Sequence, residues 1–351
     1  MKILHVIAST GVGGAEKHLL DLCVQQRDLG LQVSVVLPKE GALSHALHAE
    51  GIEYFLIRGG GRWHPLALWS LRQVIRRFQP DLIHAHMLKS ASMVGSVERS
   101  IPCIATAHNI VKRLQPFRHC QHVICVSEMV RDSLCHLGYP KAKATVVHNA
   151  VNTGAFDTGR RGEVRDQQGW QGQLVVLCVA RLVPAKGQIY AINALVQLLP
   201  QLPNIRLVLV GEGADRDKLQ QQADKCGVSE HLSLMGSRSD VADLLAATDI
   251  YLQPSIKEGF CIAFLEAMAT GLACIGTRTG AIPTMLESGV NGILIPPGDS
   301  DAIVDAIMSI ATDADRRAGY AQAARITAQT QFSPEKQARD TLKVYRHVLN
   351  R

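Results

Sequence analysis

Long hydrophobic runs and paired cysteines are both missing from this sequence. No stretch of about 18 apolar residues occurs, so we expect no membrane-spanning helix. The opening segment, MKILHVIAST, is too short in its apolar part for a secretory signal and has no cleavage site. The nine cysteines are odd in number and include no C-x-x-C pair, which fits neither a zinc site nor a disulfide framework. From these absences we expect a reduced cytosolic protein.

Charged residues are sparse, at 19%, and positive charge is unevenly distributed. Residues 1–150 hold 17 Lys and Arg against 10 Asp and Glu, whereas the remainder holds 20 against 21. This net charge of +7 in the first half predicts an anionic partner or surface for that half alone. The hydrophobic content of 47% excludes disorder, and a length of 351 residues suggests two domains.

Short apolar runs alternate with longer helical patterns, which is typical of βαβ units and parallel sheets. In the first half we predict strands at Ile3–Ile7, Gln32–Leu37, Glu53–Ile57, Leu82–Ala85, Cys103–Ala107, His122–Val126 and Thr145–His148. In the second half we predict them at Leu174–Ala180, Arg206–Val210, His231–Met235, Ile250–Gln253, Ala273–Gly276 and Gly292–Ile295. Helical patterns cover Ala15–Leu29, Leu66–Phe78 and Glu128–His136, the last with Ser127 as its N-cap.

The pattern breaks once, over residues 153–173, which are polar, Gly-rich and without an apolar period. We predict a linker or irregular domain entry there, between an N-terminal domain over 1–152 and a second domain over 174–332. The stretch Pro334–Leu349 has apolar residues at helical spacing and predicts a terminal amphipathic helix within 333–351. The predicted fold class is α/β, with two doubly wound domains that bind ligands in a cleft beyond the carboxyl ends of their strands.

The first candidate site is the glycine-rich segment Thr10–Glu16, which follows the first strand and opens a helix. Backbone N–H groups at such a helix start can cradle a phosphate. The dinucleotide fingerprint G-x-G-x-x-G fails, because the sixth position from Gly11 is Glu16. The alternative is a tight strand-to-helix turn that needs glycine only for its backbone conformation.

The second candidate site is the loop that contains Arg181 and Lys186, directly after a buried strand of the second half. Two cations five residues apart can straddle a diphosphate, with Arg as a fork and Lys as a point charge. The alternative is a pair of solvated loop cations. The position at the ligand end of the sheet favours the functional interpretation.

The third candidate site is the segment from Glu258 to Glu266, in which one carboxylate precedes a helix and the other lies about two turns later. Gly259 permits close approach of a ligand, and the helix start offers unpaired N–H donors to an anion. The alternative is two ordinary surface glutamates. The helix is rich in large apolar residues, so buried carboxylates with partners are favoured.

Twelve of the fourteen histidines lie in residues 1–150, and His84 and His86 form an H-x-H pair. No D-x-D carboxylate pair stands nearby, so we predict no metal site and interpret strand-end histidines as hydrogen-bonded neighbours of the cleft. Basic residues also cluster, with Trp63 and Trp69 interleaved in the first group. The two clusters are Arg58, Arg62, Arg72, Arg76 and Arg77, and then Lys112, Arg113 and Arg118. They indicate a membrane surface or a sugar acceptor, the alternative being a sheet-packing helix with a solvated face.

Five segments in order resemble the retaining GT-B glycosyltransferases, family four of the sequence classification. They are GGAE, RLVPAKG, LVLVGEG, the E-x7-E spacing that starts at Glu258, and TGAIPTMLESGVNGILIPPGD. The resemblance covers nearly the whole chain and implies the GT-B fold, two Rossmann-like domains facing across a cleft. It also implies a UDP-linked sugar bound by the C-terminal domain, an acceptor bound by the N-terminal domain, and a last helix that crosses back onto the N-terminal domain.

The resemblance assigns roles to individual residues. Arg181 and Lys186 would hold the diphosphate, Glu266 the ribose, and Glu258 the donor sugar. His108, in ATAHN, matches the active-site histidine of the family. Further donor-binding positions that the resemblance implies are Gly13, Gly14, Gly211, Arg238 in the loop 236–241 that would hold the base, Gly259, Phe260, Cys261 and Ile262.

This sequence departs from the family pattern at Cys261, where Gly or Ser is common, at Ala273, where Pro is common, and at Thr284, where Glu is common. None of the three departures removes a charged residue that the resemblance places in the site. They therefore bear on the identity of the donor sugar and not on the type of reaction.

We therefore predict a retaining, metal-independent hexosyltransferase without a resident cofactor. It would transfer sugar to a hydroxyl of a glycan or lipid-linked acceptor in envelope polysaccharide or glycolipid synthesis, at the inner face of the cytoplasmic membrane. Rival interpretations are a nucleotide-sugar epimerase or phosphorylase of the same fold, and a non-catalytic binder of nucleotide-sugar or nucleic acid. No nucleic-acid recognition module is evident, and the failed fingerprint disfavours a Rossmann oxidoreductase.

Overall fold

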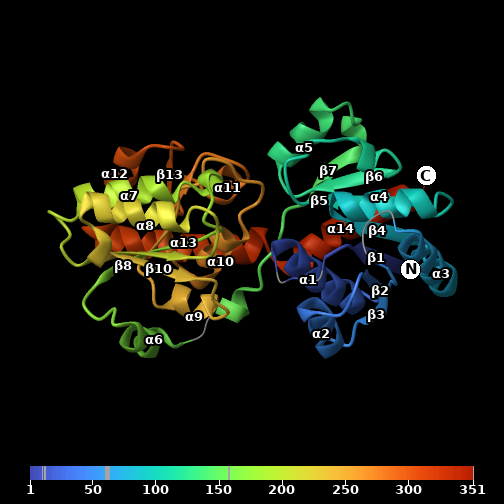
Figure 1. Cartoon of the computed structure of the whole chain (residues 1–351), viewed down its shortest axis with the longest axis horizontal. Coiled ribbons are helices and arrows are strands. Elements are labelled where there is room, and N and C mark those ends of the chain that lie inside the picture. The colour runs from blue at the N-terminus through green and yellow to red at the C-terminus, as the bar shows by residue number, and fades with distance from the viewer. Residues whose placement is uncertain (10, 12, 60–63, 157–158, 351) are drawn as a thin grey trace. The chain divides into compact units, whose positions relative to one another are not determined.

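The computed structural model describes residues 1–9, 11, 13–59, 64–156 and 159–350. The chain divides into two compact units, and each is an α/β fold (Figure 1). Unit 1 contains Met1–Ala150 and Pro334–Arg351, and unit 2 contains Val151–Ser333. Among the described helices, none is both long enough and apolar enough to cross a membrane.

Unit 1 is built on a seven-stranded parallel sheet in the order β3-β2-β1-β4-β5-β6-β7. Its strands are β1 (Lys2–Ile7), β2 (Gln32–Leu37), β3 (Glu53–Leu56), β4 (Leu82–His86), β5 (Cys103–Ala107), β6 (His122–Cys125) and β7 (Ala144–Val146). Its helices are α1 (Gly14–Asp28), α2 (Ala42–Ala49), α3 (Pro65–Phe78), α4 (Met87–Val97), α5 (Glu128–His136) and α14 (Pro334–Leu349). Ser127 caps α5 as predicted, because its side chain accepts a hydrogen bond from the amide of Val130.

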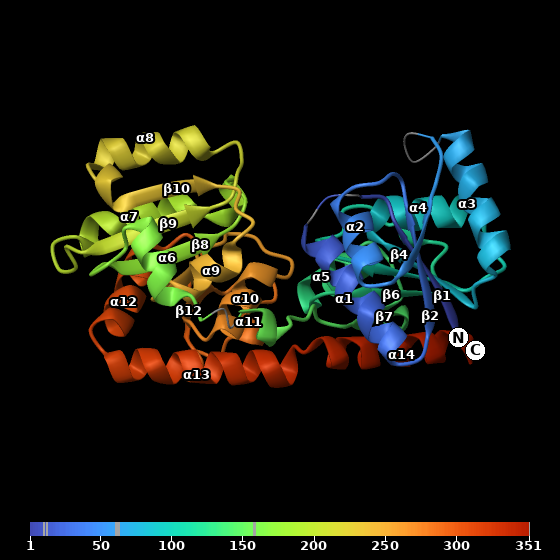
Figure 2. The same ribbon diagram turned by 90° about the horizontal axis from the view of Figure 1, so that it is seen from below.

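The last helix, α14, belongs to unit 1, although almost two hundred residues of unit 2 precede it. It lies against α1 and the sheet of unit 1, as the red helix among blue and teal elements in Figures 1 and 2. Val344, Tyr345 and Val348 enter the core that Ile3 and Leu19 help to form. The predicted return of the C-terminal helix to the first domain is confirmed, and burial of its apolar stripe explains it.

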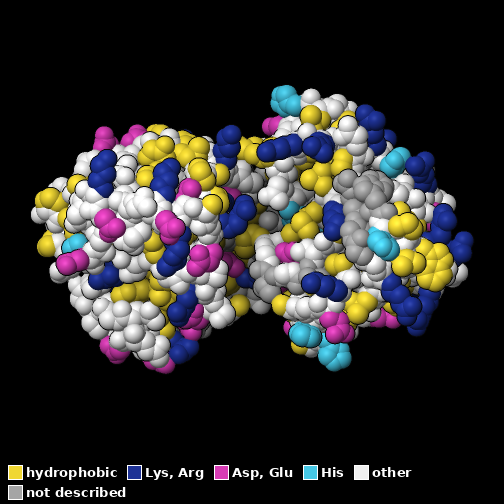
Figure 3. Space-filling view, in the orientation of Figure 1, with side chains coloured by type: hydrophobic (Ala, Val, Ile, Leu, Met, Phe, Trp, Pro, Cys, Tyr) yellow, Lys and Arg dark blue, Asp and Glu magenta, His cyan; other side chains and the backbone are white. Residues whose placement is uncertain are grey.

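The surface of unit 1 carries the basic excess seen in the sequence. On the face drawn in Figure 3, Lys, Arg and His side chains gather over unit 1, whereas acidic and basic side chains are interspersed over unit 2. Helix α3 also exposes apolar side chains, since Leu66 is 57% and Trp69 is 58% accessible. Arg62 and Trp63 of the predicted basic clusters lie outside the described residues.

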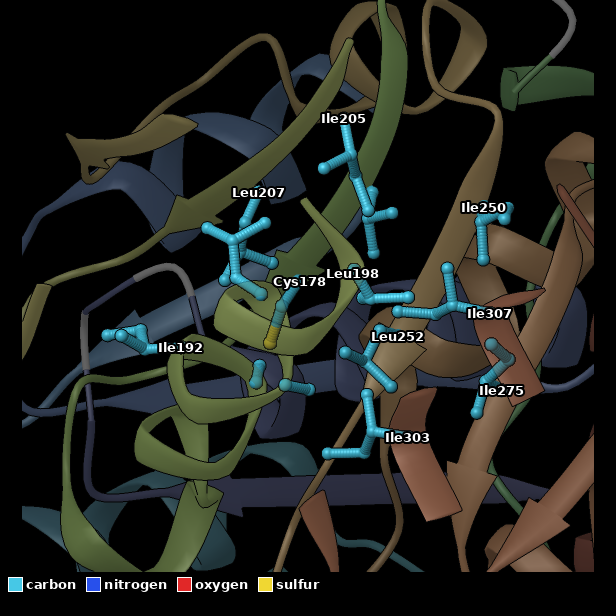
Figure 4. Close-up of a cluster of buried hydrophobic side chains, with 14 of the residues drawn as sticks. Cys178, Ile192, Leu198, Ile205, Leu207, Ile250, Leu252, Ile275, Ile303 and Ile307 are labelled. Carbon is cyan, nitrogen blue, oxygen red and sulfur yellow. The ribbon is translucent and has the colours of Figure 1, made fainter. Parts of the chain in front are cut away.

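Unit 2 is built on a six-stranded parallel sheet in the order β10-β9-β8-β11-β12-β13. Its strands are β8 (Leu174–Val179), β9 (Ile205–Val210), β10 (Leu232–Gly236), β11 (Ile250–Gln253), β12 (Ala273–Thr277) and β13 (Ile293–Ile295). Its helices are α6 (Arg161–Gln168), α7 (Gln188–Leu198), α8 (Arg216–Cys226), α9 (Val241–Ala246), α10 (Ile262–Thr270), α11 (Ile282–Met285), α12 (Ser300–Ala311) and α13 (Ala314–Gln331). Figure 4 shows side chains of strands and helices, such as Leu207, Leu252 and Ile303, meeting in one apolar core.

The polar segment 153–173 corrects the sequence interpretation, because it contains helix α6 and is part of unit 2. Its helical pattern is hard to read because Val164 and Arg165 are its only two buried residues. The Arg165 side chain donates hydrogen bonds to three backbone carbonyl oxygens, of Ala247 at 2.8 Å, Trp170 at 2.7 Å and Gln173 at 2.6 Å. These buried hydrogen bonds of Arg165 therefore hold the helix in place. Because they do not depend on apolar side chains, they produce no periodic hydrophobic pattern in the sequence.

Candidate active site

Loops that follow β8 and β11 meet at the carboxyl-end edge of the unit 2 sheet. The two strands are parallel neighbours, so their following loops must emerge side by side. After β8 the chain passes through Arg181 and a short 3-10 turn, Pro184–Lys186, into α7. After β11 it passes through Ser255 and Glu258 into α10. The second and third sequence-predicted sites thus form one site.

Lys186 and Glu258, which the sequence analysis assigned to separate ligand groups, form a buried ion pair. The Lys186 ammonium lies 2.8 and 2.6 Å from the two carboxylate oxygens of Glu258. Only 15% of the Lys186 side chain and 7% of the Glu258 side chain are accessible. The hydroxyl of Ser255 donates to the same carboxylate at 3.0 Å. Glu258 is therefore held in place by protein partners, which the sequence interpretation of a free sugar acceptor did not foresee.

A line of hydrogen bonds within unit 2 supports this pair from beneath. The hydroxyl of Tyr251 donates to Gln253 at 2.9 Å, and the Gln253 amide donates to Ser255 at 2.9 Å. Tyr251, Gln253 and Ser255 are all fully buried. This line fixes the orientation of the Glu258 carboxylate, as preorganisation of a charged site requires.

Two glycines allow the loops to pack this closely. Gly187 has φ +68° at the start of α7, and a Cβ there would overlap the carbonyl oxygen of Pro254. Gly280 has φ +59°, and a Cβ there would contact the backbone of Glu258. Left-handed backbone and a close approach together require glycine at both positions.

Arg181 lies on the same edge but in a different environment. Its side chain is exposed, and no ion pair holds it within the described part of the chain. Gly211 follows β9 and packs on the carbonyl of Ala180, so the loops after β8 and β9 are also in contact. Arg238 makes two hydrogen bonds to Asp240, at 2.8 and 2.6 Å, in the loop predicted to hold the base.

Helix α10 begins at the same edge of the sheet. Cys261 is its N-cap, and Ile262 is its first residue. Phe260 and Cys261 are buried, and burial raises the pKa of the Cys261 thiol well above its usual range. Gly259 accepts a backbone hydrogen bond from Ala281 at 3.1 Å. Glu266 is half-buried on the second turn of α10.

The glycine-rich segment of unit 1 forms the start of α1. Gly13 is the N-cap, and Gly14 is the first helical residue. The amide of Gly13 donates to the Glu16 carboxylate at 3.1 Å, so Glu16, within the first turn of α1, caps the start of its own helix. Thr10 and Val12 of the predicted segment lie outside the described residues.

His108, directly after β5, belongs to a cluster of five histidines within unit 1. Its ring centroid lies 4.8 Å from that of His18 and 5.8 Å from that of His86. His5 and His84 complete the cluster, with ring centroids 5.1 Å apart. Burial lowers the pKa of His5 and His18 to about 4 and that of His84, His86 and His108 well below the usual range. All five are therefore neutral near pH 7.

The sequence analysis did not identify His5 and His18 as members of this cluster. A signal was present, because side chains two residues apart on a strand share one face, which places His84 and His86 together. The register of the sheet then aligns His5 of β1 with His84 of β4. That register could not be read from the sequence alone.

The unit 2 edge brings together groups that suit an anion. The Lys186 ammonium, the exposed Arg181 guanidinium and the amides at the start of α10 all carry positive charge or partial charge. Such a set binds phosphate oxygens and stabilises negative charge that develops on them.

Two family profiles match the chain. Residues 12–155 match the profile described as glycosyltransferase family 4, and residues 160–327 match the profile described as glycosyl transferases group 1.

Similar proteins act on sugars. A lipopolysaccharide core biosynthesis glycosyltransferase, LpsE of Rhizobium meliloti, is 26% identical over 92% of this chain and 93% of its own length. A phosphatidyl-myo-inositol mannosyltransferase of Mycolicibacterium smegmatis is 27% identical over 88% of this chain and 83% of its own. The crystal structure of Anabaena Alr3699/HepE in complex with UDP-glucose superposes with a TM-score of 0.87 at 26% identity, covering 98% of this chain and 99% of that one.

Proposed function

The chain belongs to glycosyltransferase family 4 and has the GT-B fold, and from this premise we propose that it is a retaining hexosyltransferase that uses a UDP-linked sugar. It transfers the sugar to a hydroxyl of a glycan or lipid-linked acceptor in envelope polysaccharide or glycolipid synthesis. The buried Lys186–Glu258 pair beside the exposed Arg181 is the observation that carries this proposal.

In the proposed reaction the bond between the anomeric carbon and the diphosphate oxygen breaks, and a bond from that carbon to the acceptor oxygen forms. Negative charge grows on the leaving diphosphate, and Arg181 with Lys186 stabilises it. Glu258 keeps the Lys186 ammonium fixed, at 2.6 Å, while the diphosphate supplies its second anionic partner.

Retention follows in this proposal from attack on the face that the diphosphate leaves. The departing phosphate oxygen takes the proton of the acceptor hydroxyl, so no carboxylate nucleophile is required. His108, neutral because of burial, positions sugar or acceptor through hydrogen bonds.

The similarity to the HepE complexes with UDP and with UDP-glucose supports uridine as the base. A second donor has support from a different relative. A GDP-mannose-dependent mannosyltransferase of Mycolicibacterium smegmatis is 32% identical over 58% of this chain. GDP-mannose is therefore the alternative donor.

The acceptor side of the proposal is supported by the exposed apolar and basic side chains of α3. Two relatives are named for lipopolysaccharide core biosynthesis and for mannosyl transfer to phosphatidyl-myo-inositol. We propose that unit 1 meets a lipid-linked acceptor at an anionic membrane surface.

Calorimetry with UDP, GDP and their sugars tests the donor, and product analysis with and without acceptor tests the reaction. We expect UDP-sugar binding, transfer with retained anomeric configuration, and full turnover in EDTA, since protein cations replace a metal at the diphosphate. Release of an epimer from donor alone would favour the epimerase interpretation. Binding without turnover on any acceptor would favour a sensor, and turnover that requires Mg²⁺ or Mn²⁺ would contradict metal independence.

A further inference from the structure

Helix α14 buries two polar side chains in unit 1, although residues 151–333 of unit 2 separate it in the chain from the rest of unit 1. Tyr345 is fully buried, and Gln337 is almost fully buried. Burying a polar group costs free energy unless a hydrogen bond compensates for the lost water. Both side chains find such bonds at the histidine cluster. The last helix is therefore tied to the histidines by polar contacts as well as by apolar packing.

Tyr345 fixes the position of the hydrogen on His84. The amide nitrogen of Gln26 donates to the Tyr345 hydroxyl at 2.9 Å, and that hydroxyl directs its one hydrogen to His84 Nδ1 at 2.7 Å. His84 is neutral near pH 7, because burial lowers its pKa well below 6.5. Its hydrogen is therefore on Nε2, which donates to Thr106 at 2.7 Å. The hydroxyl of Tyr345 thus selects one tautomer of His84.

The same amide carries this order to His86. The Gln26 oxygen accepts a hydrogen bond from His5 Nε2 at 2.8 Å, so the neutral His5 ring is an acceptor at Nδ1. His86 Nε2 donates to that atom at 2.9 Å and therefore carries the hydrogen of its ring. The Tyr345 hydroxyl holds the nitrogen end of the Gln26 amide, so the tautomer of His86 also depends on Tyr345.

Gln337 acts in the same way on His18. Its amide nitrogen lies 2.9 Å from the carbonyl oxygen of His148 and 3.1 Å from His18 Nδ1, so both of its hydrogens are used. Burial lowers the pKa of His18 to about 4, and a hydrogen bond with the Asn149 side chain opposes this effect. The neutral His18 ring accepts at Nδ1 and carries its hydrogen on Nε2.

The two rings whose tautomers are fixed in this way lie beside His108. The ring centroid of His86 is 5.8 Å from that of His108, with an angle of 27° between the planes. The ring centroid of His18 is 4.8 Å from it, with an angle of 82°. A change of tautomer exchanges the donor and acceptor nitrogens of a ring, and in a buried site this alters the electrostatic field at the neighbouring ring.

We propose that Tyr345 and Gln337 of α14 are positioning residues for His108. Tyr345 fixes His86 through the chain of hydrogen bonds, and Gln337 fixes His18, so each ring beside His108 keeps a single tautomer. Docking of the last helix thereby completes the shell of hydrogen bonds that holds this part of unit 1 in one arrangement. The inference rests on the proposed function, in which His108 positions the sugar or the acceptor.

The tautomers are tested on the full chain with ¹⁵N-labelled histidine and without substrate. Long-range ¹H–¹⁵N correlation spectra distinguish a ring with hydrogen on Nδ1 from a ring with hydrogen on Nε2. We expect His18, His84 and His86 to carry hydrogen on Nε2 at pH 7. Hydrogen on Nδ1 of His84 or His18 would overturn the inference, because that nitrogen must accept from a donor of α14.

Tyr345→Phe removes one hydroxyl and keeps the aromatic ring in the core. We expect the ¹⁵N signals of His84 and His86 to shift, and turnover with saturating donor to fall about threefold to tenfold. Gln337→Met keeps the length of the side chain without a donor, and should shift the His18 signals and lower turnover over the same range. UDP affinity should stay within about twofold in both variants, since the proposed diphosphate site belongs to unit 2.

Two control variants separate positioning from stability alone. Tyr139→Phe removes the hydroxyl of another buried tyrosine of unit 1, which donates to the carbonyl of Cys120 at 3.1 Å outside the cluster. Val348→Ala weakens the packing of α14 and leaves its hydrogen bonds in place. Both should lower thermal stability, keep the histidine signals of the wild type and hold turnover within about twofold. Equal losses of turnover in Val348→Ala and Tyr345→Phe would show that α14 only stabilises unit 1, and would overturn the inference.

The failure of this inference and that of the proposed function give different results. A wild-type chain that transfers sugar, together with full turnover in Tyr345→Phe and Gln337→Met, overturns the positioning role alone. A wild-type chain that shows the expected tautomers but transfers no sugar to any acceptor overturns the proposed function alone.

Discussion

Arg181 and Lys186 lie in the same loop of unit 2, but their surroundings differ. The sequence interpretation assigned both to the diphosphate, whereas the structure also pairs Lys186 with the buried Glu258. We predict that Lys186→Met lowers the free energy of unfolding by about 3–5 kcal/mol, because it leaves a buried carboxylate unpaired. Arg181→Ala should change it by less than about 0.5 kcal/mol. Each should cut turnover about 10²–10³-fold, measured with saturating donor beside chemical denaturation.

The double variant Lys186→Met with Glu258→Gln is the control for this pair. Its stability should recover toward the wild-type value while its turnover stays low. Equal stability of Lys186→Met and Arg181→Ala would contradict the buried pair.

Glu266 lies on the second turn of α10, behind the helix start that faces the predicted diphosphate site. We predict that Glu266→Ala weakens nucleotide binding and leaves the fold intact, because a charged hydrogen-bond acceptor of the ribose is lost. Such a loss costs about 1.5–3 kcal/mol in binding free energy. Calorimetry with every nucleotide that binds the wild type checks this, and unchanged affinities would remove Glu266 from the site.

Helix α6 shows how a polar segment becomes an ordered element. We predict that Arg165→Met lowers the free energy of unfolding by about 3 kcal/mol or more, because buried carbonyl oxygens lose their donors. UDP affinity should stay within about twofold, because Arg165 binds the carbonyls of Gln173 and Ala247, which precede β8 and β11 and so lie at the amino ends of these strands, opposite the edge that carries Lys186. Arg160→Met is the matched control, since Arg160 pairs with Glu163 and Asp243 at the surface and should cost less than about 1 kcal/mol. Equal effects of the two changes would refute the anchoring role of Arg165.

Helix α3 is the element through which we predict membrane contact. Trp69 is 58% accessible, and Arg76 and Arg77 lie on the last turn of the same helix. Binding to anionic vesicles should be detectable at low salt and fade as salt rises, with about 1 kcal/mol contributed by each cation near the surface. Co-sedimentation of wild type, Trp69→Ala and Arg76→Glu measures this.

Arg316→Glu, on α13 of unit 2, serves as the charge control for α3. Vesicle binding should be unaffected by it. Absence of binding at low salt, or equal losses in Arg76→Glu and Arg316→Glu, would contradict a role for α3.

At the scale of the whole molecule, the histidine cluster makes stability depend on pH. Burial lowers the pKa of His5 and His18 from 6.5 to about 4. Between these values the unfolded chain binds more protons than the folded chain, so stability falls as pH is lowered. At pH 5 each of the two should cost about 2 kcal/mol relative to pH 7.

Thermal unfolding between pH 7.5 and pH 5 measures this effect on unit 1. Unit 2, residues 151–333, contains one histidine, His231, and supplies the internal comparison. Unfolding of unit 2, followed by the fluorescence of its buried Trp170, should show a smaller change in stability over the same pH range. Higher stability at pH 5 than at pH 7 would show that the cluster is not buried and neutral.

Much of the architecture was predictable because hydrophobic period is a local property of the chain. All thirteen predicted strands are present, with ends displaced by up to two residues, and α5 and α14 have the predicted bounds. The resemblance to family 4 was likewise carried by short contiguous segments, and the family profiles agree with it. Those segments gave candidate residues such as Lys186 and Glu258 but not their mutual contact.

Only the tertiary structure decided which side chains meet. Lys186 and Glu258 are brought together because β8 and β11 are neighbours in the sheet, although the two residues are 72 positions apart in the chain. The histidine cluster depends likewise on the register of His5 with His84 and on Tyr345 and Gln337, which α14 carries into unit 1. The sequence alone determined periodicity, composition and motif order, because these are read along the chain. Register and helix docking depend on packing between distant segments, and these decided the partners of each charged and polar group.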